Sequence, residues 1–416
     1  MKVLAVVDSE SFLKWAASLL HRIHGGGSHV TSRLAIITGP LHPTQGQVDA
    51  ALAGLPTVDY ATVNRGQLMR EVRDNPPDLV LVAATGPVAE MIALSIIAAS
   101  GERRPVFVTG SPGLAIPVAQ QGVNWRAQWT DAHIVHSPQE VDAYRHAFHL
   151  AHASPDLWLT QLPFLQAAGG VGAENSGHSD EPNHTRDSAP IAQVVFAPQS
   201  VIPHAKPDRL KILAGLAHLS TQGYRVVVKL RTAAGEQQTH YEALPYDRLW
   251  DQEHQHMGFG KEALSFATGP MSQWLTPGSA LVTLSSTAAL EALAARIPTV
   301  LISDFGVSPQ LANVVFSDSG CLVELADIGQ LLRNGGPEPS ADWMQASYFH
   351  NHSIDLYATS HTLVAAAQAG RLAERKQAQP VNRPIFWYSI LKSRFPFIWS
   401  PAKLVRSVLG RLTKLH

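Results

Sequence analysis

Residues 280–306, ALVTLSSTAALEALAARIPTVLISDFG, decide the fold class of this chain. The apolar run Leu281–Leu284 predicts a buried strand, and the Ala- and Leu-rich stretch that continues to Arg296 predicts a helix, which a proline then ends. A second buried strand is predicted over Thr299–Ser303, just before Asp304. Strand, helix and strand in this order are typical of a parallel sheet covered by helices.

The residues between the first strand and the helix, Ser285, Ser286 and Thr287, predict an anion site. The first turn of a helix has free backbone N–H groups and the positive end of the helix dipole, and both attract phosphate. Glu291 lies one turn further along the same helix face, where its carboxylate can accept hydrogen bonds from sugar hydroxyls. The alternative is that Ser286 or Thr287 only caps the helix.

The composition describes a globular chain of two domains. Its 416 residues, 45% hydrophobic and 16% charged, exceed the usual length of one hydrophobic core and are not typical of disorder. A net charge of −1 argues against nucleic acid as a partner. The lone Cys321 excludes an internal disulfide and fits the cytoplasm. No apolar run is long enough to span a bilayer, and the histidines lack metal-ligand spacing, so we expect no metal.

Alternating strands and helices predict two Rossmann-like units. In the first half, buried strands are predicted at Val3–Val7, Leu34–Thr38, Leu79–Ala83, Val106–Thr109 and Ala132–His136. After a polar, Gly-rich stretch, further strands are predicted at Gln193–Ala197 and Arg225–Leu230. We therefore expect an N-terminal acceptor domain over 1–165, a flexible linker over 166–190, a nucleotide-sugar domain over 191–370 and a tail over 371–416.

The tail changes character because Lys and Arg alternate with aromatic residues from Arg383 to His416, without any Asp or Glu. Leu404, Val405 and Leu412 fall on one side of a predicted helix. This pattern is typical of an amphipathic helix on anionic lipid, so we expect a protein that is peripheral on the inner face of the cell membrane. The alternative is a helix that packs on the body of the protein.

Further polar residues stand where strands of the second domain are predicted to end, and they are candidates for binding a donor. Lys229 and Arg231 end a buried strand and could meet a phosphate, unless they only reach solvent. Gly269, Pro270 and Met271 form a tight turn that a base or sugar could approach, unless the turn is an ordinary one. Asp304 ends the following strand.

In the first domain, Asp8 follows a buried strand and is the first candidate for a general base, unless it caps the next helix. His136 ends another strand and is a candidate acid or base, with a structural role as the alternative. The remaining residues at strand ends or in the first turns that follow are candidates for binding an acceptor: Ser9, Ser11, Lys14, Thr85, Gly86 and Gly113.

The order of the segments DSESFLKW, RPVFVTGSPG, HSPQEV, VVVKLR and VTLSSTAALEALA resembles a bacterial family of putative glycosyltransferases over most of residues 1–350. More distantly, the second half is similar to GT-B capsular polysaccharide transferases that use CMP-activated sialic acid or Kdo. Ser285–Ser286 matches their SS motif, which holds the nucleotide phosphate. Lys229-Leu230-Arg231 stands where they carry an HP motif, and His240 is the candidate to replace its histidine. Glu291 lies where many GT-B enzymes place a carboxylate on the donor ribose.

The resemblance implies an α/β GT-B fold, two Rossmann-like domains with parallel sheets that face an interdomain cleft. It implies a glycosyltransferase without a cofactor. We expect Lys229, Arg231 and the hydroxyls of 285–287 to neutralise the leaving phosphate, so that no divalent metal is needed. The expected donor is a nucleotide sugar, with a CMP-sugar favoured. The expected acceptor is a glycan or lipid-linked glycan of cell-envelope polysaccharide synthesis. A polyol-phosphate transferase, a sugar-nucleotide epimerase and a non-catalytic glycan-binding protein are the alternatives.

Overall fold

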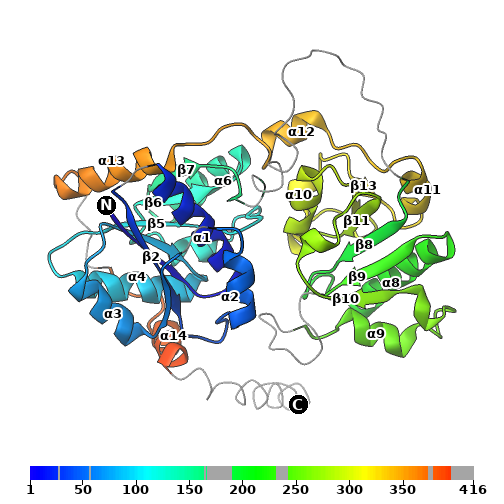
Figure 1. The fold of residues 1–416 in the computed structure, drawn as a ribbon, viewed down its shortest axis with the longest axis horizontal. Helices are drawn as coiled ribbons and strands as arrows, with labels where there is room; N and C mark the ends of the chain where they lie inside the picture. The colour runs from blue at the N-terminus through cyan, green and yellow to red at the C-terminus, as the bar shows by residue number, and fades with distance from the viewer. Residues whose placement is uncertain are drawn as a thin grey trace. The chain divides into compact units, whose positions relative to one another are not determined.

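The computed structural model describes residues 1–26, 29–55, 58–163, 165, 190–230, 242–372 and 378–394. The chain forms two compact units, Met1–Pro163 together with His352–His416, and Phe164–Asn351 (Figure 1). Each unit contains one parallel sheet. The predicted linker up to residue 189 and the tail beyond residue 394 lie outside the described residues.

The first unit is built on a seven-stranded parallel sheet. Its strands, in order across the sheet, are β3 (Tyr60–Val63), β2 (Thr31–Ile37), β1 (Lys2–Val7), β4 (Leu79–Ala83), β5 (Val106–Gly110), β6 (Ala132–Val135) and β7 (Asp156–Leu159). The chain winds outward from β1 in one direction and from β4 in the other, so the strand order reverses between these two strands. Its helices are α1 (Glu10–Gly25), α2 (Gln45–Leu52), α3 (Arg65–Asp74), α4 (Gly86–Ser100), α5 (Gln120–Asn124), α6 (Pro138–Leu150), α13 (Leu356–Gln368) and α14 (Arg383–Arg394).

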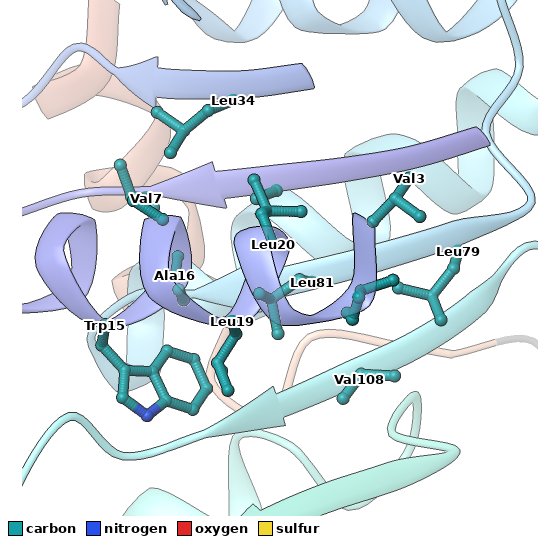
Figure 2. Packing of buried hydrophobic residues seen from close by; sticks show 14 of the residues in the cluster. Val3, Val7, Trp15, Ala16, Leu19, Leu20, Leu34, Leu79, Leu81 and Val108 are labelled. Atoms are coloured by element: carbon teal, nitrogen blue, oxygen red, sulfur yellow. The ribbon is translucent and has the colours of Figure 1, made fainter. Parts of the chain in front are cut away.

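Alternate residues of β1 face two hydrophobic cores on opposite sides of this sheet. Val3 and Val7 belong to one core with α1, α2 and α13, whereas Leu4 and Val6 belong to the other with α3, α4 and α14. Figure 2 shows α1 lying along the strands with Leu20 among their side chains. Because both faces of the strand are buried, its sequence is a continuous apolar run rather than an alternation of apolar and polar residues.

The second unit repeats this plan with six parallel strands. Across the sheet they are β10 (Ser265–Ala267), β9 (Arg225–Lys229), β8 (Gln193–Ala197), β11 (Ser279–Thr283), β12 (Thr299–Ile302) and β13 (Leu322–Val323). The strand order reverses between β8 and β11. Its α-helices are α8 (Lys206–Thr221), α9 (Tyr246–Glu253), α10 (Thr287–Ala294), α11 (Ile328–Arg333) and α12 (Ala341–Ala346). Side chains of β8, β9, β11 and β12 share one core with α8, α9 and α11.

The buried strands predicted from the sequence are present, with ends that differ by a few residues at most. Four shorter strands, β3, β7, β10 and β13, were not predicted. Tyr60 and Ser265 begin two of them at the sheet edges, where side chains remain exposed and no continuous apolar run marks the strand. The structure also divides the chain differently from the predicted boundary at residue 370, because α13 packs on α1 and shares its core through Leu356 and Val364.

The segment that begins at residue 378 is hydrogen-bonded to α4 through a buried carboxylate. Glu90 is 2% exposed, and its Oε1 accepts a hydrogen bond of 2.8 Å from the Val381 backbone N–H. Burial raises the pKa of Glu90 to about 7. The folded protein therefore holds a proton on Glu90 at pH values where the unfolded chain has lost it.

This pKa predicts a pH dependence of stability. Because the folded state binds more protons, the free energy of unfolding falls as the pH rises from about 4.5 to about 7, by up to about 3 kcal/mol from Glu90. Glu90→Gln keeps an oxygen that accepts from the Val381 N–H and should remove this part of the decline. Urea unfolding at several pH values measures the difference from the wild type. The exposed Glu102→Gln is the matched control and should leave the profile unchanged; equal slopes for wild type and Glu90→Gln would contradict the assignment.

Candidate functional site

The carboxyl edge of the second sheet holds the described residues that were predicted to bind a donor. Strands β9, β8, β11 and β12 are consecutive neighbours and run parallel, so their carboxyl ends share one edge. Lys229 is the last residue of β9, Ser285 and Ser286 follow β11, and Asp304 follows β12. In open parallel sheets, ligands bind at this edge beside the reversal of strand order, which here lies between β8 and β11.

The first two hydroxyls after β11 have structural partners. Ser285 is fully buried, and its Oγ donates to the Ala312 carbonyl oxygen at 2.5 Å. Ser286 is the N-cap of α10, and its Oγ accepts from the Ala288 backbone N–H at 3.2 Å. The capping role that the sequence left open is therefore present at Ser286. Capping occupies only an acceptor position, so the Ser286 hydroxyl can still donate its proton to an anion.

Thr287 is the first residue of α10 and is partly exposed, and Glu291 is partly exposed one turn later. The backbone at the start of α10 supplies the positive end of the helix dipole. Ser285 thus fixes the loop beneath the helix, while Ser286, Thr287 and Glu291 remain the residues that a bound anion and its sugar could reach.

Beside β9, the turn after β10 carries the predicted Gly269, Pro270 and Met271. Gly269 has a φ of +105°, a conformation that favours glycine, and Pro270 is exposed. Lys229 is partly exposed at the end of the neighbouring strand. Two further residues predicted for this site lie outside the described part of the chain: Arg231 and His240.

Asp304 has a structural explanation in this fold. Its Oδ2 accepts from the Leu325 backbone N–H at 2.7 Å, and its Oδ1 lies 2.8 Å from the Lys211 Nζ. The Asp304 side chain is 7% exposed. Because both carboxylate oxygens are engaged in holding the end of β12, we do not retain Asp304 among the donor-binding residues.

Sequence reasoning missed Arg209, which connects two loops of this edge. Arg209 lies on α8, is 2% exposed and donates to the carbonyl oxygens of Ser200 and Pro203 in the loop after β8. It also donates to the carboxylate of Glu242 and the carbonyl of Leu244, which precede α9. A guanidinium with several fixed donors can hold two loops at once. In the sequence, nothing about a charged residue near the start of a predicted helix shows that it holds two loops.

The reversal point of the first sheet carries a buried carboxylate. Asp8 follows β1, and Thr85 follows the neighbouring β4 and is the N-cap of α4. The Thr85 backbone N–H and Oγ1 donate to Asp8 Oδ2 at 2.9 and 2.6 Å. The alternative for Asp8 was that it caps the next helix. It does not, because Ser9 occupies the N-cap position of α1.

The other oxygen, Asp8 Oδ1, is buried and has no partner of hydrogen-bonding geometry in the part of the chain that the structure describes. Burial raises the pKa of Asp8, and the hydrogen bonds from Thr85 oppose this rise only in part. A carboxylate of raised pKa with one unoccupied oxygen can accept a proton or a hydrogen bond from a ligand. Asp8 is nevertheless only 3% exposed, so access to it is narrow.

Unlike Asp8, which has one oxygen without a partner among the described residues, His136 has both of its ring nitrogens in polar contacts. Its Nε2 accepts from the Trp15 Nε1–H at 2.8 Å, and its Nδ1 lies 2.8 Å from the Thr160 carbonyl oxygen. The ring is fully buried. These contacts require the proton on Nδ1, which donates to Thr160. His136 therefore has the structural role that the sequence left as the alternative, and we remove it from the catalytic candidates.

The remaining candidates of the first unit differ in exposure. Ser9 is nearly buried beside Asp8, whereas Ser11 and Lys14 are exposed on α1. Gly86 begins α4, where an added Cβ would lie 2.7 Å from the Trp125 ring. Gly113 is partly exposed in the loop after β5.

Two more buried polar side chains near this edge were not predicted. Arg126 is 8% exposed and donates to the carbonyl oxygens of Ala84 and Gly122 at 2.8 Å. His133 is 1% exposed and packs on the Tyr144 ring, with 4.2 Å between the ring centroids. Burial and the nearby Arg126 hold the pKa of His133 well below its usual value. Among the described residues, no group of three or more His, Cys, Asp or Glu could hold a metal ion.

The structural role of His136 can be tested with a double-mutant cycle. Trp15→Phe removes the indole donor and leaves a buried imidazole nitrogen unpaired, so the free energy of unfolding should fall by about 1–3 kcal/mol. His136→Gln should also destabilise the protein, and the double variant should lose less than the sum of the two, with a coupling of about 1 kcal/mol or more. Urea unfolding measures each variant. Additive losses would show that this hydrogen bond does not stabilise the fold.

One family model covers most of the chain. It is described as "Putative glycosyltransferase (DUF6716)" and matches residues 3–366. No curated protein matches the sequence.

Solved structures match the fold over nearly the whole length of both chains. The complex of S. aureus MnaA with UDP has a TM-score of 0.51 at 12% identity and covers 90% of this chain and 98% of that chain. A putative UDP-N-acetylglucosamine 2-epimerase from Listeria monocytogenes has a TM-score of 0.54 at 11% identity, with 92% and 99% covered. A UDP-glucose:anthocyanidin 3-O-glucosyltransferase in complex with UDP has a TM-score of 0.50 at 9% identity, with 88% and 99% covered. The expected GT-B-like fold is confirmed.

Proposed function

The chain belongs to the family of putative glycosyltransferases whose model it matches, and from that membership we propose that it transfers a sugar from a nucleotide-activated donor to a hydroxyl of an acceptor. The second unit would bind the donor and the first unit the acceptor. This proposal combines the family, the fold and the placement of polar groups at the carboxyl edges of the two sheets.

The observation that carries the proposal is the start of α10 beside the strand reversal of the second sheet. Ser286 and Thr287 stand there with a helix N-terminus, and Lys229 ends a strand on the same edge. Hydroxyls, backbone N–H groups and a cation together would stabilise the negative charge that develops on a departing nucleotide phosphate. Glu291 would accept hydrogen bonds from donor hydroxyls. Arg209 would keep the loops after β8 and before α9 in place around this site.

For the acceptor, we assign Asp8 as the general base. Its raised pKa makes the ionised form a stronger base than an exposed aspartate, and Oδ1 is the oxygen that would take the proton of the attacking hydroxyl. Thr85 would hold the carboxylate through Oδ2 while Oδ1 reacts. Ser9 follows Asp8 and Gly86 follows Thr85 in the chain, and both would contact the acceptor.

The nucleotide of the donor is the finer part of the proposal. The Ser285–Ser286 match favours a CMP-sugar, whereas the similar structures of S. aureus MnaA and the anthocyanidin glucosyltransferase contain UDP. We propose a glycan or lipid-linked glycan of the cell envelope as acceptor, following the resemblance to capsular polysaccharide transferases. A thermal-shift screen of the full chain with CMP, CDP, UDP, GDP and ADP, each with and without Mg²⁺, would identify the nucleotide.

Thr287→Val tests the donor site without removing a helix cap. The change keeps the shape of the side chain but removes the hydroxyl, so the dissociation constant of the nucleotide selected by that screen should rise about tenfold, as expected for one lost partner of a phosphate. Isothermal titration calorimetry measures the constant. Thr276→Val is the matched control, because Thr276 precedes the amino end of β11 on the opposite edge of the sheet. Equal affinities for both variants and the wild type would place the nucleotide elsewhere.

Asp8→Asn tests the base. The amide keeps an oxygen for the Thr85 hydrogen bonds but cannot take a proton, so transfer should slow by about 10²–10⁴-fold. Nucleotide affinity should stay unchanged because Asp8 belongs to the acceptor unit. Stability at pH 7 should not fall, because burial disfavours the charge that the substitution removes. An Asp8→Asn variant with full transfer rates would exclude Asp8 as the base.

A sugar-nucleotide epimerase is the second candidate, because the similar structures include UDP-N-acetylglucosamine 2-epimerases. The two activities differ in their products. An epimerase converts UDP-N-acetylglucosamine to its C2 epimer without any acceptor, whereas a transferase releases free nucleotide only slowly until an acceptor hydroxyl is supplied. Proton NMR of the donor, with and without an acceptor glycan, distinguishes these outcomes.

A further inference from the structure

Exposed apolar side chains gather at the last described helix. In the described part of the chain, seven large hydrophobic side chains are exposed, and three of them lie between residues 381 and 391. These three are Val381 at 46%, Trp387 at 62% and Leu391 at 45% exposed, and Trp387 is the most exposed of the seven. Isolated exposed hydrophobic residues are common, but a tryptophan with two apolar neighbours marks a surface that can bind a partner.

The orientation of α14 is fixed by contacts with the first unit. Phe386 is 9% exposed and belongs to the core beneath α3 and α4, and Ser389 and Ser393 are nearly buried on the same helix face. The Thr38 Oγ1 donates to the Ser393 carbonyl oxygen at 2.7 Å, and α14 lies beside α4 in Figure 1. None of the described helices is long and apolar enough to cross a bilayer. Helix α14 is therefore seated on the protein body by one face.

The opposite face carries Trp387 and Leu391 one turn apart, with the exposed Arg383 one turn before them. We name Arg383, Trp387 and Leu391 the outer face of α14. Such a face presents apolar groups together with a cation. Tryptophan is favoured at a membrane surface because its ring is apolar while its N–H remains polar.

The segment that contains α14 is positively charged, which fits an anionic surface. After Glu374 the sequence has no Asp or Glu up to its last residue, His416, and it has nine Lys or Arg over 375–416. The whole chain has a net charge of −1, so this excess of positive charge is local. Each Lys or Arg of a basic segment adds about 1 kcal/mol to the free energy of binding to an anionic bilayer. Burial of the apolar side chains in the bilayer adds further binding free energy.

We propose that the outer face of α14 is a docking surface for an anionic lipid bilayer. The helix would lie parallel to the membrane plane, with Trp387 and Leu391 inserted at the headgroup level and with Arg383 at the lipid phosphates. Because the inner face of α14 is packed on α4, the first unit would be held at the membrane in one orientation. This docking requires no nucleotide and no transferase activity, so it stands apart from the proposed function.

Sedimentation with lipid vesicles tests the proposal on the purified full chain. The wild type should bind vesicles of phosphatidylcholine that contain about a third phosphatidylglycerol, bind pure phosphatidylcholine far less, and dissociate at high salt. Trp387→Ser/Leu391→Ser should weaken binding to the anionic vesicles about tenfold or more. Leu150→Ser is the matched control, because Leu150 is also an exposed leucine, at 56%, on another helix of the same unit. Thermal unfolding should show that all three proteins fold equally well.

Three results would overturn the proposal. The first is a wild type that does not sediment with anionic vesicles, and the second is a double variant that sediments as well as the wild type. The third is a concentration-dependent dimer of the wild type, seen by light scattering, that Trp387→Ser/Leu391→Ser abolishes and that does not bind vesicles. In that case the outer face of α14 contacts a second copy of the chain instead of lipid.

Discussion

The reversal of strand order in each parallel sheet is the constraint on which the candidate site depends. At a reversal, the chain leaves two neighbouring strands in opposite directions, so the loops at their carboxyl ends separate and the helix N-termini that follow face open space. The first sheet reverses between β1 and β4, where Asp8 meets Thr85, and the second between β8 and β11, where α10 begins after Ser286. In each unit, polar side chains therefore stand at the same topological position, beside the reversal of strand order.

Buried polar contacts then decide which side chains at these edges remain available. Ser285 anchors the loop at Ala312, Asp304 holds the end of β12, and His136 joins Trp15 to the chain beyond β7. An unpaired polar group in the interior costs free energy, so such groups are first satisfied by the fold. The buried Asp8 Oδ1 is an exception among the described residues, and unsatisfied groups of this kind are common where a ligand binds.

The sequence predicted the strands that are buried on both faces. Short apolar runs such as Val3–Val7 and Leu281–Leu284 are stabilised by burial on both sides of a parallel sheet. The sequence missed β3, β7, β10 and β13, whose side chains are less fully buried and whose pairing depends on a neighbour already in place. It predicted a site at the strand ends, but it could not distinguish the buried Ser285 from the partly exposed Thr287. It gave no sign that Arg209 or Arg126 is buried, because their partners are mostly backbone carbonyls brought close only by folding.

By itself, the amino-acid order determined two parallel α/β units, the strands at their centres and the hydroxyl-rich start of α10, because these follow from local periodicity and from residues adjacent in the chain. Only the tertiary structure decided that α13 and α14 return to the first unit and that Glu90 holds Val381. It also decided that His136 is a buried structural residue. These outcomes depend on contacts between residues far apart in the chain, whose burial and hydrogen-bonding partners exist only after the sheets have formed.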